Sequence, residues 1–385
     1  MSVSQFFQKF QSLETPFYFY DIALLRKTLI ELKQCLGDSQ FHVHYAMKSN
    51  VNRRILNEVK AFGLGADCVS GNEVKRALEV GFSADQIVFA GVGKTDKEIQ
   101  FGLEHDIFAF NVESIEELKV LDEMAGRMGK KTRFALRVNP NVEAGTHKYI
   151  TTGTRDNKFG ITIEELWEAL DLVQGLKHAH FIGIHFHIGS QINDLSRFIE
   201  LAGKVTELQK ELVKRGFELP HVNVGGGLGI DYDDPDATPI ANFKEYFELF
   251  KKHLQLLPGQ QLHFELGRSI TGQCGSLISK VLYTKPGKDT TFAILDSGMT
   301  ELIRPALYQA SHKIENLTSN AEFGTYDIVG PICESSDAFA RGISLPKTQR
   351  GDLMAVRSTG AYGEVMANRY NLREIAPSIY SDDLV

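Results

Sequence analysis

Two side chains with catalytic potential stand at the ends of short apolar runs. Lys48 follows the run 41–46, and Glu265 ends the run 262–265. A lysine that is shielded from water at the end of a strand can have a depressed pKa and act as a nucleophilic amine. His185 and His187 are two residues apart on a third apolar run, so both face the same side of that strand. These residue types predict an amine nucleophile supported by a carboxylate and an imidazole.

A glycine-rich segment lies between two of these runs. Four of the five residues 225–229 are glycine: Gly225, Gly226, Gly227 and Gly229. So many glycines cost chain entropy, and backbone N–H groups that cradle a phosphate would explain them. Gly267 and Arg268 follow the carboxylate of Glu265 directly. A lysine, an acid, a histidine and a phosphate cradle together indicate pyridoxal phosphate chemistry, in which the cofactor ring acts as an electron sink.

The elements that must position these residues alternate regularly. Eight strand-like runs are separated by segments with apolar residues at three- and four-residue spacing. This alternation predicts a (β/α)8 barrel, a TIM barrel, whose active site lies at the carboxyl ends of the strands; a doubly wound open sheet would also alternate. Ser114 and Glu117 resemble a capping box at one helix start. The expected strands are 41–46, 65–68, 87–89, 107–110, 133–138, 181–187, 221–224 and 262–265.

The pattern of predicted elements changes after Arg268. Strand-like segments at 276–283, 291–295, 326–329 and 352–358 alternate with turn residues and contain few helical patterns. They predict a second, all-β domain of sandwich or barrel type. We therefore expect a barrel domain over 26–265 and a β domain formed by 1–25 and 266–385.

Composition excludes several classes of protein. The 385 residues include 42 basic and 49 acidic side chains, a net charge of −7, which argues against nucleic-acid or membrane-surface partners. No apolar stretch is long enough to span a bilayer. The four cysteines show no disulfide or metal-binding spacing, which is typical of a reducing cytoplasm. We expect a cytoplasmic enzyme without a metal site.

The motifs resemble those of the fold-type III pyridoxal-phosphate-dependent decarboxylases along nearly the whole chain. The resemblance implies an alanine racemase-like barrel with a C-terminal β domain, and within the family it is greatest for the group that converts meso-2,6-diaminopimelate to L-lysine and CO2. It also implies a homodimer that shares its active sites. One departure from the usual pattern is Arg369. The matching segments are 44–50, 187–191, 225–229, 265–268, 330–337 and 360–363.

The resemblance assigns roles residue by residue. Lys48 would hold the cofactor covalently, His187 would stack on its ring, and Glu265 would pair with the ring nitrogen. Cys333 would return a proton to the substrate. The phosphate region would be held by Ser190, Gly225, Gly226, Gly227, Gly267, Arg268 and Tyr362, and the ring edge by Asp67 and Arg137.

The remaining implied roles concern the substrate. Arg304 and Tyr308, helped by Arg268 and Tyr362, would hold a distal carboxylate, which a guanidinium recognises in bidentate fashion. Cys333 and Glu334 would come from the partner subunit. A loop near Lys158 would lie over the site.

Three alternatives stay open at this point. A related decarboxylase could act on carboxynorspermidine, ornithine or arginine. A metal-dependent barrel hydrolase could use His185 and His187 as ligands. A homologue without turnover could keep only the fold. The acidic Glu265 at the ring nitrogen favours decarboxylation over racemisation, because a protonated ring withdraws electrons more strongly.

Overall fold

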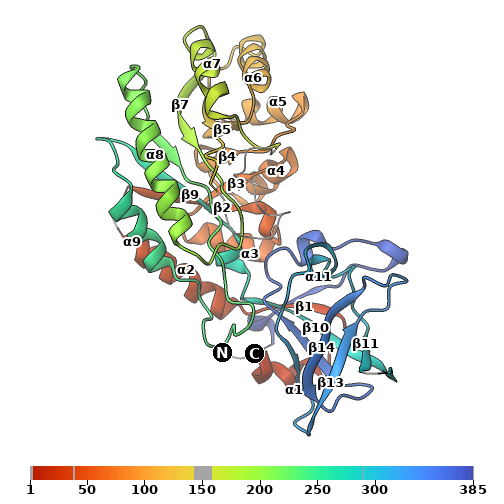
Figure 1. The fold of residues 1–385 in the computed structure, drawn as a ribbon. Helices are drawn as coiled ribbons and strands as arrows, with labels where there is room; N and C mark the ends of the chain where they lie inside the picture. Colours follow the sequence, from red (N-terminus) through yellow and green to blue (C-terminus); the bar gives the residue numbers. More distant parts are fainter. Residues whose placement is uncertain (1–2, 38–39, 143–157, 289, 385) are drawn as a thin grey trace. The chain divides into compact units, whose positions relative to one another are not determined.

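The computed structural model describes residues 3–37, 40–142, 158–288 and 290–384. Within one compact unit, formed by residues 29–229 and 242–267, eight parallel strands close into a barrel in sequence order (Figure 1). The first and last strands close the ring by pairing His44 with Glu265. The strands are β2 (Phe41–Ala46), β3 (Gly65–Cys68), β4 (Ile87–Phe89), β5 (Ala109–Val112), β6 (Thr132–Arg137), β7 (Ala179–His185), β8 (His221–Asn223) and β9 (Gln261–Leu266).

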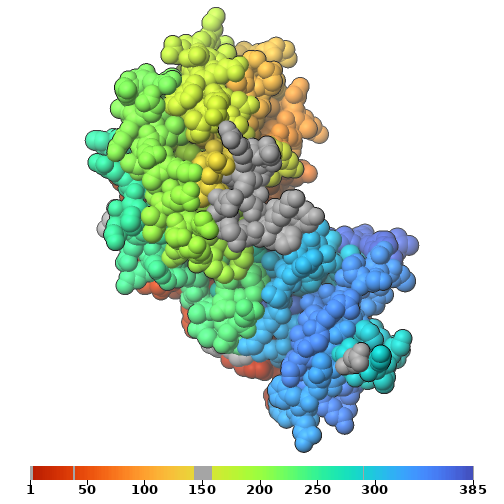
Figure 2. All heavy atoms as spheres, viewed as in Figure 1, coloured from red at the N-terminus to blue at the C-terminus, as the bar shows by residue number. Residues whose placement is uncertain are grey.

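Amphipathic helices connect the strands and lie outside the ring (Figure 1). Side-chain caps define several helix starts; for example, the Asn52 side chain accepts a hydrogen bond from the Arg54 amide. The outer face of α8 is open to solvent in Figure 2. The helices are α3 (Arg53–Ala61), α4 (Gly71–Val80), α5 (Asp96–Glu104), α6 (Ile115–Arg127), α7 (Ile163–Val173), α8 (Ser196–Lys214) and α9 (Phe243–His253); α2 (Ile22–Leu36) precedes β2.

The predicted barrel is confirmed, including the positions of its eight strands to within two residues at every end. The expected capping box at α6 is only half formed: the Ser114 side chain accepts from the Glu117 amide, but the Glu117 carboxylate accepts from the Glu113 amide instead of the Ser114 amide.

The second unit consists of residues 1–28, 230–241 and 268–385, and its main feature is an eight-stranded, mostly antiparallel sheet. The N-terminal strand β1 (Phe17–Tyr20) pairs with β10 (Gly275–Pro286) and β16 (Ser378–Tyr380). Buried phenylalanines, among them Phe10 and Phe17, pack beneath it. The other strands are β11 (Thr291–Leu295), β12 (Ile314–Asn316), β13 (Phe323–Val329), β14 (Ala338–Pro346) and β15 (Leu353–Arg357), and a short helix α11 (Arg304–Tyr308) precedes β12.

Residues 230–241 were expected within the barrel domain, but they group with the second unit. Charged contacts explain this placement. Asp236 pairs with Arg357 at 2.9 Å, and Lys313 lies 3.3 Å from Asp236 and 3.4 Å from Asp234. A segment that leaves the barrel after β8 is thus bound by the sheet unit through ion pairs that involve residues distant in sequence. Among the described residues, no helix is both long and apolar enough to cross a membrane.

Candidate active site

The carboxyl ends of the barrel strands bring Lys48 next to a buried carboxylate. Lys48 lies in a single 3-10 turn after β2, and its Nζ is 3.9 Å from Oδ2 of Asp67, at the end of β3. Neither oxygen of Asp67 has a hydrogen-bond partner among the described residues. Burial, and then the nearby charge of Glu265, raise the pKa of Asp67 well above its ordinary value.

Glu265 is held by three donors inside the barrel. Its Oε1 accepts hydrogen bonds from Nδ2 of Asn223 at 2.8 Å and Nδ2 of Asn111 at 3.2 Å. Its Oε2 accepts from Nε2 of His185 at 3.1 Å. Burial raises the pKa of Glu265, but the hydrogen bond from His185 and the charge of Lys48 outweigh it and keep the pKa below the ordinary value. Of two buried acids in one barrel, Glu265 therefore carries the negative charge and Asp67 is pushed toward the neutral form.

Asn111 and Asn223 were not predicted as site residues. Each is a fully buried polar side chain on an apolar strand. The sequence does hold one indication for Asn223. It stands two residues after His221, and therefore on the same face of the strand, and two residues before Gly225. His185 contacts Glu265 through Nε2 and is 1% exposed.

The glycine segment is constrained by neighbouring backbone. A Cβ on Gly226 would lie 1.9 Å from the carbonyl oxygen of Glu265, and one on Gly225 would lie 2.3 Å from that of Phe186. Gly225 and Gly227 also have positive φ angles of 70° and 105°. The glycines are therefore required by close backbone packing between strand ends, in addition to any role in binding an anion.

His187 contacts this segment directly. Its Nδ1 accepts a hydrogen bond from the Gly226 amide at 3.3 Å. Burial, together with the positive charges of Lys48 and Arg137, lowers the pKa of His187 well below the ordinary value. A neutral imidazole with Nδ1 as acceptor is thus placed beside the glycines. Ser190 follows it on the same loop, and Gly267 packs against Ser49, where a Cβ would lie 2.8 Å from Oγ.

A buried ion-pair network holds Arg137. Arg137 donates to Glu113 at 2.8 Å, and Glu113 also accepts from the amides of Gly91 and Gly160. Lys94 lies beside this network, with its Nζ 2.6 Å from Glu117 and a side chain that is 1% exposed. The network was not predicted, because Glu113 and Lys94 lie in loops of no distinctive pattern.

The second unit gathers a cluster of arginine and aromatic side chains. Arg268 donates to Tyr232 Oη at 2.5 Å, and its guanidinium lies 4.6 Å from the centre of the Tyr362 ring. The Arg304 guanidinium lies 4.8 Å from the centre of the Tyr232 ring. Tyr232, which sequence reasoning missed, belongs to the reassigned segment 230–241 and therefore joins both arginines.

Arg304 and the half-buried Tyr308 begin and end helix α11. Arg304 donates to Nε2 of His312 at 2.7 Å. Burial, followed by the charge of Arg304, lowers the pKa of His312 to about 3, so His312 accepts this bond as a neutral imidazole. Nε of Arg304 is buried and has no partner among the described residues.

Cys333 and Glu334 lie on an exposed loop of the same unit. The Cys333 amide donates to the Asn371 side chain at 3.3 Å, and Tyr370 Oη donates to Glu334 at 2.7 Å. Two apolar or aromatic residues nearby are exposed: Tyr370 is 47% exposed and Leu372 is 94% exposed. The loop thus presents a thiol and a carboxylate at a surface with exposed apolar side chains.

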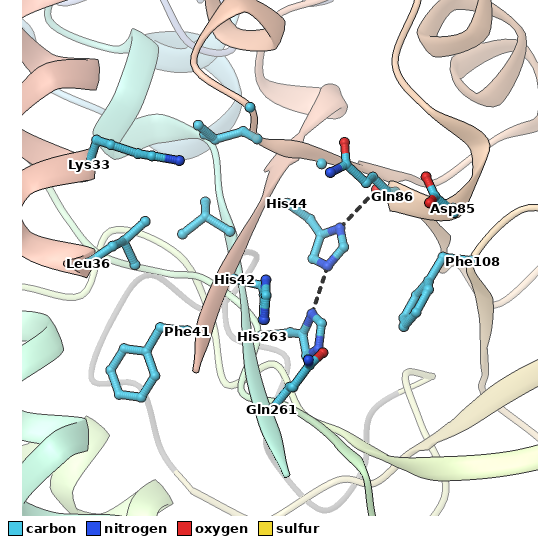
Figure 3. A pocket seen from close by; sticks show the side chains of 14 residues that line it. Lys33, Leu36, Phe41, His42, His44, Asp85, Gln86, Phe108, Gln261 and His263 are labelled. Carbon is cyan, nitrogen blue, oxygen red and sulfur yellow. Dashed lines mark hydrogen bonds between the residues drawn. The ribbon is translucent and has the colours of Figure 1, made fainter. Parts of the chain in front are cut away.

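A cavity of about 300 Å³ lies at the opposite, amino-terminal end of the barrel (Figure 3). His44 donates from Nδ1 to the Gln86 carbonyl at 3.1 Å, and its Nε2 accepts from Nδ1 of His263 at 2.9 Å. These contacts determine the tautomer of His44, because the Gln86 carbonyl can only accept and the hydrogen of His44 must therefore be on Nδ1. Three or more ligands suited to a metal ion do not come together anywhere in the described part of the chain.

Comparisons with known proteins agree with this geometry. The model of the pyridoxal binding domain of pyridoxal-dependent decarboxylases matches residues 22–272. The diaminopimelate decarboxylase of Bacteroides thetaiotaomicron is 54% identical over 98% of both chains, and that of Helicobacter pylori J99 is 40% identical over 94% of this chain and 89% of its own. The crystal structure of H. pylori diaminopimelate decarboxylase complexed with L-lysine superposes with a TM-score of 0.92 at 38% identity, covering 98% of this chain and 94% of that chain. The chain belongs to the diaminopimelate decarboxylase family of pyridoxal-dependent decarboxylases.

Proposed function

We propose that this protein decarboxylates meso-2,6-diaminopimelate to L-lysine and CO2 with pyridoxal phosphate as its cofactor. The observation that carries the proposal is the presence of Lys48 and an ionised Glu265 in one barrel mouth of a chain that is 54% identical to a diaminopimelate decarboxylase. When bound, the cofactor would delocalise the electron pair left on the substrate Cα after CO2 leaves.

The residues present fit this cofactor. Lys48 supplies the amine for the covalent bond, and Glu265 supplies a negative charge for a protonated ring nitrogen. His187 is a neutral imidazole suited to stacking on an aromatic ring. The orphaned Asp67 carboxylate lies beside Lys48, and Arg137 is fixed by Glu113, so both are suited to contact polar atoms at the ring edge.

The phosphate would be held by backbone and by cationic side chains. We assign this role to Ser190, the bare backbone at Gly225, Gly226, Gly227 and Gly267, and to Arg268 and Tyr362. The guanidinium of Arg268 next to Tyr362 supports the assignment, because arginine matches phosphate geometry.

We expect Arg304 and Tyr308 to recognise the substrate by binding its distal carboxylate. Arg304 is buried, and its Nε donor has no partner among the described residues, so a substrate carboxylate would satisfy it. Ornithine and arginine carry a cationic group at the far end, which a buried guanidinium would repel. This favours a substrate with carboxylates at both ends.

We further propose a homodimer in which Cys333 and Glu334 complete the site of the partner. Their exposure next to Tyr370 and Leu372 supports this, because an exposed apolar surface is typical of an interface. Cys333 would return a proton to Cα as general acid, and Glu334 would bind the far ammonium group. The free cysteines support a cytoplasmic location, and neither a nucleic acid nor a membrane is expected as a partner.

Product analysis tests the function. Pyridoxal phosphate-loaded protein should convert meso-2,6-diaminopimelate to equimolar lysine and CO2, and Lys48→Ala should lose both this activity and the visible absorbance of the bound cofactor. Turnover of ornithine, arginine or carboxynorspermidine in place of diaminopimelate would refute the substrate assignment. Mixing inactive Lys48→Ala with inactive Cys333→Ala should restore part of the activity, and confirmed mixed dimers without activity would refute the shared site.

A further inference from the structure

We infer that Asn111 and Asn223 are positioning residues that hold Glu265 so that only Oε2 is left to receive the N–H of a pyridine ring. The inference rests on the proposed function and adds two residues and one atom assignment to it. All groups involved lie in the barrel unit, and each side chain is at most 5% exposed.

The hydrogen bonds assign the orientation of Asn223. The Gly225 amide donates to Oδ1 of Asn223 at 2.9 Å, and an N–H must face an acceptor. The other side-chain atom of Asn223, 2.8 Å from Oε1 of Glu265, is therefore the NH2 group. Asn223 thus links the start of the glycine segment to the carboxylate and fixes the spacing between them.

The acceptor sites of Glu265 can then be counted. An ionised carboxylate has about two acceptor sites on each oxygen. Oε1 uses both, for Asn223 and Asn111, whereas Oε2 uses one, for Nε2–H of His185. Within the part of the chain that the structure describes, no second donor reaches Oε2, so one acceptor site is left on this oxygen. A single ring N–H matches it.

The choice of amides has an electrostatic consequence. Hydrogen bonds from neutral groups favour the ionised carboxylate without cancelling its charge. An arginine or lysine in place of Asn111 or Asn223 would form an ion pair with Glu265 and weaken its attraction for a cationic ring. Removing an amide makes Glu265 a stronger base, so that the shared proton moves from the ring nitrogen toward the carboxylate.

Asn111→Leu is the cleaner test, because the only side-chain hydrogen bond described for Asn111 is that to Glu265. Asn223→Leu also removes the bond to Gly225. Gln209→Leu is a matched control, since Gln209 is a buried amide on α8 whose side-chain atoms have no hydrogen-bond partner among the described residues. Each protein is loaded with pyridoxal phosphate carrying 15N at the ring nitrogen.

We expect the 15N resonance of Asn111→Leu and Asn223→Leu to move toward that of a neutral pyridine, and kcat to fall roughly tenfold or more with KM little changed. The double variant should shift further. Resonances and kcat values that match those of Gln209→Leu would overturn the inference, and if Asn223→Leu does not fold, Asn111→Leu decides. A 15N resonance that stays unchanged in Glu265→Gln would instead refute the proposed role of Glu265 itself.

Discussion

The histidines at the amino-terminal end of the barrel should make the barrel unit sensitive to acid. Burial lowers the pKa of His44 to about 4, and burial is also the main cause that lowers the pKa values of His221 and His263 well below the ordinary value. We compare the free energy of unfolding of the variant His44→Gln with that of the wild type at pH 7 and pH 5. Glutamine cannot be protonated but can still donate to the Gln86 carbonyl and accept from His263.

The sign and size follow from proton linkage. The folded protein keeps His44 neutral, whereas the unfolded chain binds a proton below its ordinary pKa of about 6.5. The stability contributed by the neutral form is complete above that pH and is lost as the pH falls toward 4. Down to pH 5 the loss extends over about 1.5 pH units, which at about 1.36 kcal/mol per unit gives about 2 kcal/mol from His44 alone.

Urea unfolding of the cofactor-free protein measures this loss. The single tryptophan, Trp167, lies on α7 of the same unit, 3.8 Å from the Arg215 guanidinium, so its fluorescence reports on the barrel. The free energy of unfolding should fall by about 2 kcal/mol less in His44→Gln than in the wild type between pH 7 and pH 5. The exposed His105→Gln serves as a control and should follow the wild type. An equal fall in His44→Gln and the wild type would refute the assignment of His44 as a buried neutral group.

Two further predictions concern the site. Gly226→Ala places a methyl group against the Glu265 carbonyl and should weaken pyridoxal phosphate binding at least roughly tenfold in a titration of the apoprotein. The control is Gly203→Ala on α8, where the added Cβ meets nothing within 4 Å and binding should be normal. Equal affinities of the two variants would contradict the packing argument. Glu113→Gln should leave the Arg137 charge buried without its partner and lower the free energy of unfolding by roughly 3 kcal/mol in urea, and a loss of less than about 1 kcal/mol would show that the pair is dispensable.

Much of the barrel could be predicted because each strand is a short apolar run bounded by turn residues. The positions of Lys48, His187 and Glu265 follow once the strand ends are known, since parallel strands bring their carboxyl ends together. Segment 230–241 could not be placed this way, because its location depends on ion pairs with Lys313 and Arg357, far away in sequence.

The partners of Glu265 were missed for a different reason. A single asparagine on an apolar strand is as compatible with a turn or a strand end as with a buried hydrogen bond, and its partner cannot be read from spacing. Only the closed barrel brings Asn111, on β5, and Asn223, on β8, to the same carboxylate oxygen of β9. Side chains that stand at a recognisable strand end could be predicted, whereas Asn111 and Asn223, which act by holding Glu265, could not.

The polar interior of the barrel is divided into two electrostatic regions. At the amino-terminal end, burial lowers the pKa values of His44, His221 and His263 by more than the negative charge of Glu265 raises those of His44 and His221. These histidines are therefore neutral, and they stabilise the fold only above the pH at which the unfolded chain is protonated. Toward the carboxyl end, Glu265 keeps its charge because three donors replace the water it lost. Acid should therefore weaken the barrel at its neutral histidines while Glu265 is still ionised, and unfolding and activity should depend on pH through different groups.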